Sequence, residues 1–166
     1  MSHHITPSFD FCPHCGAATQ MEHIDNQDLK ACSAQCGFVH FNNPTPVVAV
    51  IVETEEGVVL AHNVAWPPGM FSVITGFVDA YELPEQTALR ETQEELGLVA
   101  TEAKLVGHYM FKQKNQLIIA YAVKAQGEIQ INHELDAFKV IPTDKLKGWP
   151  GPTGAAVTDW LATLVN

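Results

Sequence analysis

All four cysteines of this 166-residue chain lie in two close pairs near its beginning. Cys12 and Cys15 form a C-x-x-C pair, and Cys32 and Cys36 follow after sixteen intervening residues. A C-x-x-C turn directs two thiolates at one ion, and a second close pair completes a tetrahedral four-sulfur site. The spacing therefore predicts a closed, structural zinc site, which limits what the first quarter of the chain can fold into.

Two other arrangements of this segment are open. A pair of disulfides would need an oxidising compartment, and the first ten residues lack the basic and apolar stretches of an export signal. His14, His23 and His40 lie close enough in the sequence to replace the fourth cysteine as a ligand. We expect zinc bound by the four cysteines.

The cysteine segment resembles a zinc ribbon, a module that is too small to bury a core of its own and folds around its metal. Many ribbons bind nucleic acid, but residues 11–41 hold one lysine, Lys30, and no arginine. We expect residues 1–43 to form a ribbon domain that serves as a scaffold or in a homodimer.

The charge of the whole chain also disfavours nucleic acid. Nine Lys and Arg stand against nineteen Asp and Glu, a formal net charge of −10 that repels phosphate backbones and anionic lipid. No stretch approaches the roughly 18 to 20 apolar residues that span a bilayer. We expect a cytoplasmic protein with neither a nucleic-acid nor a membrane partner. A divalent cation could still bridge this acidic chain to a phosphorylated small molecule.

The remainder, residues 44–166, alternates between apolar runs and turns, as one main domain would. Residues 47–52 are continuously apolar and mostly β-branched, which predicts a strand covered on both faces. The same reasoning predicts further strands at 58–61, 71–74, 105–111 and 117–123, and a closing helix at 153–165.

One helix has clear boundaries and an unusual charge pattern. Pro84 suits its first position and Gly97 the residue after its last turn. Within it, Glu91, Glu94 and Glu95 lie on one side at helical spacing. A solvated helix face is one explanation, but like charges at this spacing repel and no lysine of the helix offsets them. Mg²⁺ or Mn²⁺ would, because hard cations prefer several oxygen ligands.

Together with residues 76–82, called the approach loop below, this helix resembles a Nudix box. The glycine is Gly76, Glu82 follows after five residues, and after seven more comes Arg90-Glu-Thr-Gln-Glu-Glu-Leu-Gly-Leu98. Thr92 stands where the family usually has an aliphatic residue. The resemblance implies a Nudix-type α/β/α sandwich with a mixed sheet (class α+β or α/β), preceded here by a ribbon like that of the NADH pyrophosphatases.

The resemblance also implies roles for individual residues. Glu91, Glu94 and Glu95, with the carbonyl oxygen of Gly76, would bind the divalent cations. Glu82 and Arg90 would form a supporting ion pair. The general base would come either from the box, as Glu91, or from a later loop, as Glu134, and both stay candidates.

The resemblance implies hydrolysis of the pyrophosphate bond in a nucleoside diphosphate linked to another moiety, such as ADP-ribose, NADH or FAD. The Ser-Gln-Pro-Trp-Pro-Phe-Pro stretch of NADH pyrophosphatases is absent after the box, which favours ADP-ribose-like compounds over NADH. Candidate substrate contacts are Trp66, Phe71, Tyr109, Phe111 and Lys112, although such aromatic residues are often part of a core.

Two other functions are compatible with the same fold. A nucleotide-sensing domain that has lost its chemistry is one, and an isomerase is the other. Neither needs all three box glutamates, and this chain has Glu91, Glu94 and Glu95 together. The sequence therefore favours the enzyme.

Overall fold

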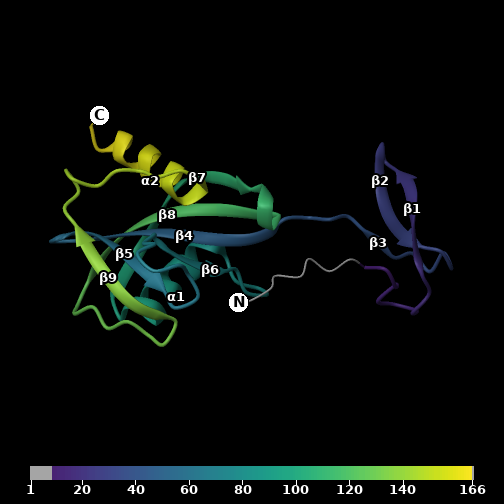
Figure 1. Cartoon of the computed structure of the whole chain (residues 1–166), viewed down its shortest axis with the longest axis horizontal. Coiled ribbons are helices and arrows are strands. Elements are labelled where there is room, and N and C mark those ends of the chain that lie inside the picture. The colour runs from purple at the N-terminus through teal and green to yellow at the C-terminus, as the bar shows by residue number, and fades with distance from the viewer. Residues whose placement is uncertain (1–8, 166) are drawn as a thin grey trace. The chain divides into compact units, whose positions relative to one another are not determined.

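A computed structural model describes residues 9–165, and this part of the chain divides into two compact units (Figure 1). One unit ends at Pro44 and the other begins at Thr45. The first eight residues and Asn166 lie outside the described part, so the beginning of the expected ribbon domain and the last residue of the expected second domain are not covered.

The first unit is a small antiparallel sheet in the order β1-β2-β3, with strands Thr19–Ile24, Gln27–Cys32 and Val39–His40. Asp25 and Asn26 form the β1–β2 turn, both with positive φ (48° and 63°), which is the conformation that a two-residue hairpin favours. None of these strands was predicted from the sequence, because each is at most six residues long and carries few apolar side chains.

The second unit is built on a six-stranded mixed sheet. Its main path runs β7-β8-β4-β5-β9, and β6 pairs with β4 beside that path. The β4–β8 pair is parallel and all other pairs are antiparallel. The strands are β4 Thr45–Thr54, β5 Gly57–Asn63, β6 Ile74–Phe77, β7 Val99–Phe111, β8 Gln116–Gln126 and β9 Leu135–Ile141.

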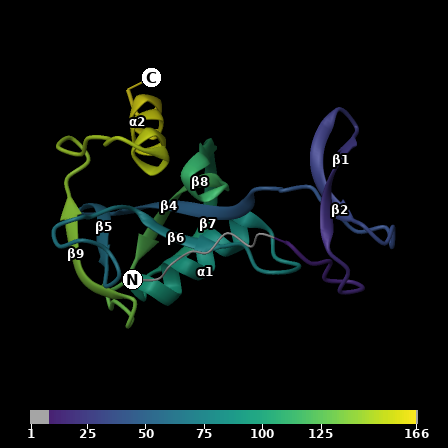
Figure 2. The same ribbon diagram turned by 45° about the vertical axis from the view of Figure 1, so that its right-hand side comes forward.

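Both faces of this sheet are covered, which explains the continuous apolar run of β4. Val48, Val50 and Val52 face a cluster that includes Ala88 and Leu96 of helix α1 (Pro84–Leu96). The alternate residues of β4 face a second cluster with Val157 and Trp160 of helix α2 (Pro152–Thr163). Figures 1 and 2 show the two helices on opposite sides of the sheet. The predicted α/β/α sandwich with a mixed sheet is confirmed.

One strand prediction needs correction, and one strand was missed. A strand was expected at 71–74, whereas β6 occupies Ile74–Phe77 and Ser72 forms only an isolated bridge to Ala61. The reason is that β4 is long enough for two neighbours on one edge, with β5 beside its end and β6 beside its beginning. Strand β9 was not predicted from the sequence, and in the structure its burial pattern does not alternate.

Helix α1 begins and ends as its sequence signals predict. Pro84 is its first residue, and the Gln86 side chain accepts the Leu83 backbone N–H at 2.9 Å. Gly97 ends it in the left-handed region (φ 68°), where its N–H donates to the Gln93 carbonyl oxygen at 2.9 Å. These two ends fix which residues of the helix face the sheet.

Within the described residues, neither helix has both the length and the apolar character that crossing a bilayer requires.

Candidate functional site

Helix α1 presents its three glutamates at graded depth. Glu95 is buried, with 6% of its surface exposed, Glu91 is half-buried, and Glu94 is exposed. The gradient follows from the helix geometry, because the apolar stripe of Ala88, Thr92 and Leu96 packs on the sheet and Glu95 lies next to it. The Thr92 hydroxyl donates to the Ala88 carbonyl oxygen at 2.7 Å, so this departure from an aliphatic residue leaves no buried polar group unsatisfied.

Glu95 is a buried carboxylate surrounded by like charges. Among residues 9–165 no hydrogen bond or ion pair reaches its side chain. Burial raises its pKa to about 8, and the charges of Glu91, Glu134 and Glu94 add to the shift. Burial also raises the pKa of Glu91, against the opposing effect of Arg90. Glu95 therefore lacks a counter-charge, which a bound cation would supply.

Gly76 of β6 lies directly beneath Glu91. A Cβ atom at Gly76 would lie 2.1 Å from both Cδ and Oε1 of the Glu91 carboxyl group. Only glycine therefore lets this carboxylate reach the strand, which accounts for a residue that is otherwise unfavourable within a strand. The close approach places the Glu91 carboxylate against the backbone of Gly76.

Arg90 connects the approach loop to the helix. Its Nε lies 2.9 Å from Glu82 Oε1 and its Nη2 lies 3.0 Å from Glu82 Oε2, a two-pronged ion pair. Nη2 also donates to the Phe77 carbonyl oxygen at 3.2 Å. The Arg90 hydrogen bonds lower the pKa of Glu82 to about 2. The structure thus brings together the two residues expected to form a supporting pair.

Arg90 makes two further contacts that the sequence analysis missed. Its Nη1 lies 2.7 Å from Glu91 Oε1 and 2.9 Å from Glu94 Oε2. The i,i+4 spacing of Arg90 and Glu94 is the signal that could have revealed one of them. Consequently two of the three carboxylates share one guanidinium, and Glu95 has none.

Glu134 approaches the helix from the segment before β9. The Asn132 N–H donates to the Glu95 carbonyl oxygen at 3.2 Å, and the Val64 N–H donates to the Glu134 carbonyl oxygen at 2.9 Å. The exposed Glu134 side chain is near enough for its charge to raise the pKa values of Glu91 and Glu95. Both candidates for the general base thus lie by the same carboxylate cluster.

The expected substrate contacts lie in different places. Trp66 lines a cavity of about 20 Å³ together with Glu95, Asn63 and Thr75, two residues that the sequence analysis did not select. Phe71, Tyr109 and Phe111 instead pack on the α2 side of the sheet, where the Tyr109 hydroxyl donates to Asp159 at 2.7 Å. Lys112 lines a surface cleft of about 540 Å³ at the beginning of α2. The structure therefore places Trp66 alone of these five beside the carboxylates.

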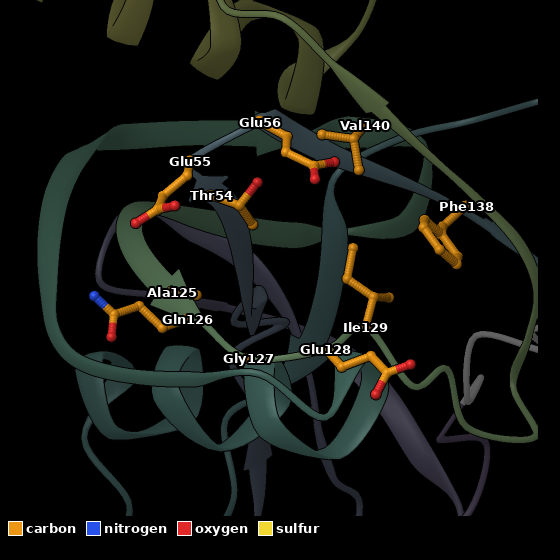
Figure 3. Close-up of a pocket in the computed structure, with 10 residues that line it drawn as sticks. All are labelled: Thr54, Glu55, Glu56, Ala125, Gln126, Gly127, Glu128, Ile129, Phe138 and Val140. Atoms are coloured by element: carbon orange, nitrogen blue, oxygen red, sulfur yellow. The ribbon is translucent and has the colours of Figure 1, made fainter.

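A third, separate pocket, of about 600 Å³, lies where strands β4 and β8 end. It combines three glutamates with apolar side chains, as Figure 3 shows: Thr54, Glu55, Glu56, Ala125, Gln126, Gly127, Glu128, Ile129, Phe138 and Val140. None of the expected site residues lies in it.

In the first unit, the four cysteines converge as the spacing predicts. All four are free thiols, and their sulfur atoms lie within 4.8 Å of one another. Cys12 Sγ lies 3.4 Å from Cys36 Sγ, and Cys15 Sγ lies 3.4 Å from Cys32 Sγ. Zn–S bonds of about 2.3 Å in a tetrahedron would separate sulfur atoms by about 3.8 Å, so the cluster suits a zinc ion. The geometry contains no disulfide among these residues.

Comparisons with known proteins agree with this arrangement. The model of the NUDIX domain family matches residues 43–161. The NAD-capped RNA hydrolase NudC of Vibrio vulnificus (strain CMCP6) is 30% identical over 166 residues, which cover 98% of this chain and 62% of the relative. The protein of the same name from Pseudomonas aeruginosa (strain LESB58) is 32% identical over 120 residues, or 72% of this chain and 42% of the relative.

The chain thus spans less than two thirds of the length of these curated relatives. Among solved structures, a NUDIX hydrolase from Nitrosomonas europaea has a similar fold, with a TM-score of 0.77 at 21% identity over 92% of this chain and 90% of that one.

Proposed function

Because the chain belongs to the NUDIX domain family, we propose that it hydrolyses the pyrophosphate bond of a nucleoside diphosphate linked to another moiety, in the ADP-ribose, NADH or FAD class. The observation that carries this proposal is Glu95, a buried carboxylate without a counter-charge beside Glu91 and Glu134. A fold that maintained such a group without a cation would lose stability from it.

The donor chemistry around Glu95 suits a Mg²⁺ or Mn²⁺ ion, although among the described residues only the four cysteines already bring their ligand atoms within 4.8 Å of one another. Glu91, Glu94 and Glu95 offer hard oxygen ligands on adjacent turns, and Gly76 brings its backbone against Glu91 where any larger residue would displace that side chain. When bound there, a divalent cation polarises phosphoryl oxygens and lowers the pKa of a water molecule. We propose the three glutamates and the Gly76 carbonyl oxygen as its ligands.

The other residues position these groups or accept the proton. Glu82 and Arg90 fix the approach loop on α1, and neither reacts. The attacking water must lose a proton to a carboxylate, and Glu91 and Glu134 are the two candidates to accept it.

Two observations bear on the substrate. The relatives are NAD-capped RNA hydrolases, and an NAD cap contains the same pyrophosphate bond as free NADH. The net charge of −10 and the single lysine in residues 11–41 oppose a long RNA contact. We therefore propose a free dinucleotide-like diphosphate as the substrate and NAD-capped RNA as the second candidate.

We further propose that residues 1–43 form a zinc ribbon domain through Cys12, Cys15, Cys32 and Cys36, and that residues 44–166 form the hydrolase domain. A closed four-sulfur site has no open position for water, so zinc would support the fold or a homodimer and not the chemistry. Four free thiols in one cluster suit a reducing compartment such as the cytoplasm.

The experiment that tests the function is a substrate panel with Mg²⁺, with Mn²⁺ and without metal. It contains ADP-ribose, NADH, FAD and a short NAD-capped RNA, and mass spectrometry identifies the products. We expect cleavage between the two phosphorus atoms of at least one free dinucleotide, only with metal. Cleavage of the capped RNA alone would favour the second candidate, and binding without turnover of any substrate would favour the sensing domain.

A further inference from the structure

His62 stands at the end of β5 with both ring nitrogens engaged, and its side chain is 10% exposed. Its Nδ1 lies 2.5 Å from Asp136 Oδ1, and its Nε2 lies 3.0 Å from the carbonyl oxygen of Pro67. A carbonyl oxygen only accepts hydrogen bonds, so Nε2 carries a proton. An ionised carboxylate also only accepts, so Nδ1 carries one too. The geometry describes an imidazolium ion paired with a carboxylate.

A β-bulge creates this pair. His62 pairs with Ala137, and the next residue, Asn63, pairs with Leu135, so Asp136 is an extra residue in strand β9. Bulges of this kind redirect a side chain and occur often beside functional sites. Without the extra residue, strict alternation would not bring the Asp136 carboxylate to this ring.

The ring joins two segments that lead to the carboxylate site. The Pro67 carbonyl also accepts the Met70 N–H at 3.2 Å, so the His62 bond holds the turn of the loop that carries Trp66. On the other side, Asp136 lies two residues after Glu134. Trp66 lines the cavity at Glu95, and Glu134 is close enough to influence the pKa of Glu95.

We propose that His62, as an imidazolium ion, is a positioning residue that holds the Trp66 loop and the Glu134 segment beside Glu95. The inference rests on the proposed hydrolase function and adds to it a residue that has no role in the chemistry. It also explains a pair between a nearly buried histidine and a half-exposed aspartate that the proposed mechanism does not otherwise use.

The charges around His62 favour its protonated form. The Asp136 hydrogen bond raises the pKa of His62, the Pro67 carbonyl raises it further, and burial opposes both. Lys139, also on β9, lies 3.8 Å above the centroid of the Phe71 ring, and that ring is 5.7 Å from the His62 ring. From α1, Glu95 lines the cavity beside Asn63. Because the folded-state pKa is raised, the stabilisation is present at low pH and is lost as the pH rises through that pKa.

Nitrogen-15 NMR of the ring tests the protonation state, and the metal-free parent protein can be used. We expect His62, assigned with the His62→Gln variant, to carry protons on both nitrogens at pH 6 and to titrate above 6.5. Asp136→Asn should lower that pKa. A His62 ring with a single proton at pH 6 would overturn the proposal.

Steady-state kinetics from pH 6 to 9 test the consequence for the reaction. At pH 6.5 we expect His62→Gln to lower kcat roughly tenfold with little change in KM, because it would displace Glu134, one of the two candidate bases, and so slow the chemical step. The difference in kcat between His62→Gln and the parent should shrink as the pH rises, since His62 of the parent then loses its proton and the ion pair with Asp136. Asp136→Asn, at a half-exposed position, should show the same trend if His62→Gln folds poorly.

His23→Gln is the matched control, because His23 Nδ1 likewise faces an aspartate, Asp28, at 2.9 Å. Both residues are exposed and belong to the first unit, which holds the four cysteines and is called the ribbon unit below. It should leave kcat and its pH profile unchanged. Equal kcat in His62→Gln and the parent, or an equal deficit at every pH, would overturn the positioning role. If the parent hydrolyses nothing, the proposed function fails and the positioning role of His62 fails with it, whereas the NMR result still decides whether the His62 imidazolium pairs with Asp136.

Discussion

The two units differ in where the residues that we propose as cation ligands lie relative to the apolar core. In the described part of the ribbon unit, two of the four cysteines are themselves buried core residues, and Leu29 and Ala31 are their buried apolar neighbours. In the second unit, called the sheet unit, apolar clusters pack on both faces of the six-stranded sheet. The carboxylates of helix α1 lie at the edge of one of these clusters. Metal should therefore be a condition of folding in the ribbon, whereas in the sheet unit it should be a condition of chemistry.

The largest effect that this comparison predicts is the loss of activity in Glu95→Gln. The substitution keeps size and removes the charge that would hold the cation. We expect turnover of the best substrate to fall on the order of a hundredfold or more, because metal polarisation of a phosphoryl group is worth several kcal/mol. Assays at equal Mg²⁺ measure it, with Glu102→Gln, an exposed glutamate of β7, as the control. Activity within a few-fold of the parent would make the acidic side of α1 a solvated face.

Removal of zinc should affect the folding of the ribbon unit and not the reaction. Elemental analysis should find about one zinc per chain, and Cys32→Ser or a strong chelator should unfold residues 9–44 while the sheet unit stays folded. Backbone amide NMR spectra would show both results, because only ribbon resonances should collapse. We expect kcat to change by less than about threefold, since a closed site takes no part in the reaction. A metal-free protein with an ordered ribbon would contradict this role.

A smaller effect is expected from Gly76→Ala, which separates activity from stability within the sheet unit. The added methyl group would push the Glu91 side chain aside, because the clash involves its carboxyl end and not the backbone. We predict roughly a tenfold loss of kcat from the misplaced carboxylate, with little change in stability. Kinetics combined with thermal unfolding separate the two. An unfolding midpoint that falls in proportion to activity would mean that Gly76 serves the fold alone.

The smallest effect concerns the Glu82–Arg90 pair. The folded-state pKa of Glu82 is about 2, below its ordinary value of 4.5, so its contribution to stability is present above pH 4.5 and is lost as the pH falls toward 2. Glu82→Gln should lower the free energy of unfolding at pH 7 by about 1 to 2 kcal/mol, since the pair is only partly shielded from water. The difference from the parent should shrink at pH 3. Urea unfolding at both pH values measures it, and a constant difference would contradict the assignment.

The parts of this molecule that the sequence predicted are those set by local spacing. The ends of α1 follow from Pro84 and Gly97, and the cysteine cluster follows from two close pairs. The ion pair of Glu82 and Arg90 was expected from a resemblance whose residues are also close in sequence. Each of these depends on contacts over a few residues or on a metal geometry that is known in advance.

The parts that escaped prediction depend on pairing between distant segments. The position of β6 was set by the free edge that β5 leaves on β4, which no local pattern of residues 71–77 reveals. The bulge that brings Asp136 to His62 is a register shift between strands more than seventy residues apart in sequence. The depth of Glu95, compared with the exposed Glu94 beside it, depends on how α1 packs on the sheet.

The proposed function depends on Glu95, a buried carboxylate that should lower stability without metal and bind the divalent cation when metal is present. Its folded-state pKa of about 8 lies above its ordinary value of 4.5, so the metal-free protein should lose stability as the pH rises from about 4.5 to 8.

Thermal unfolding of the parent and of Glu95→Gln at pH 8.5, with and without Mg²⁺, measures this claim most directly. Without metal, the account predicts a higher Tm for Glu95→Gln, and on addition of Mg²⁺ it predicts a rise in Tm for the parent and little for the variant. A lower Tm of metal-free Glu95→Gln, together with equal Mg²⁺ shifts in both proteins, would contradict the account.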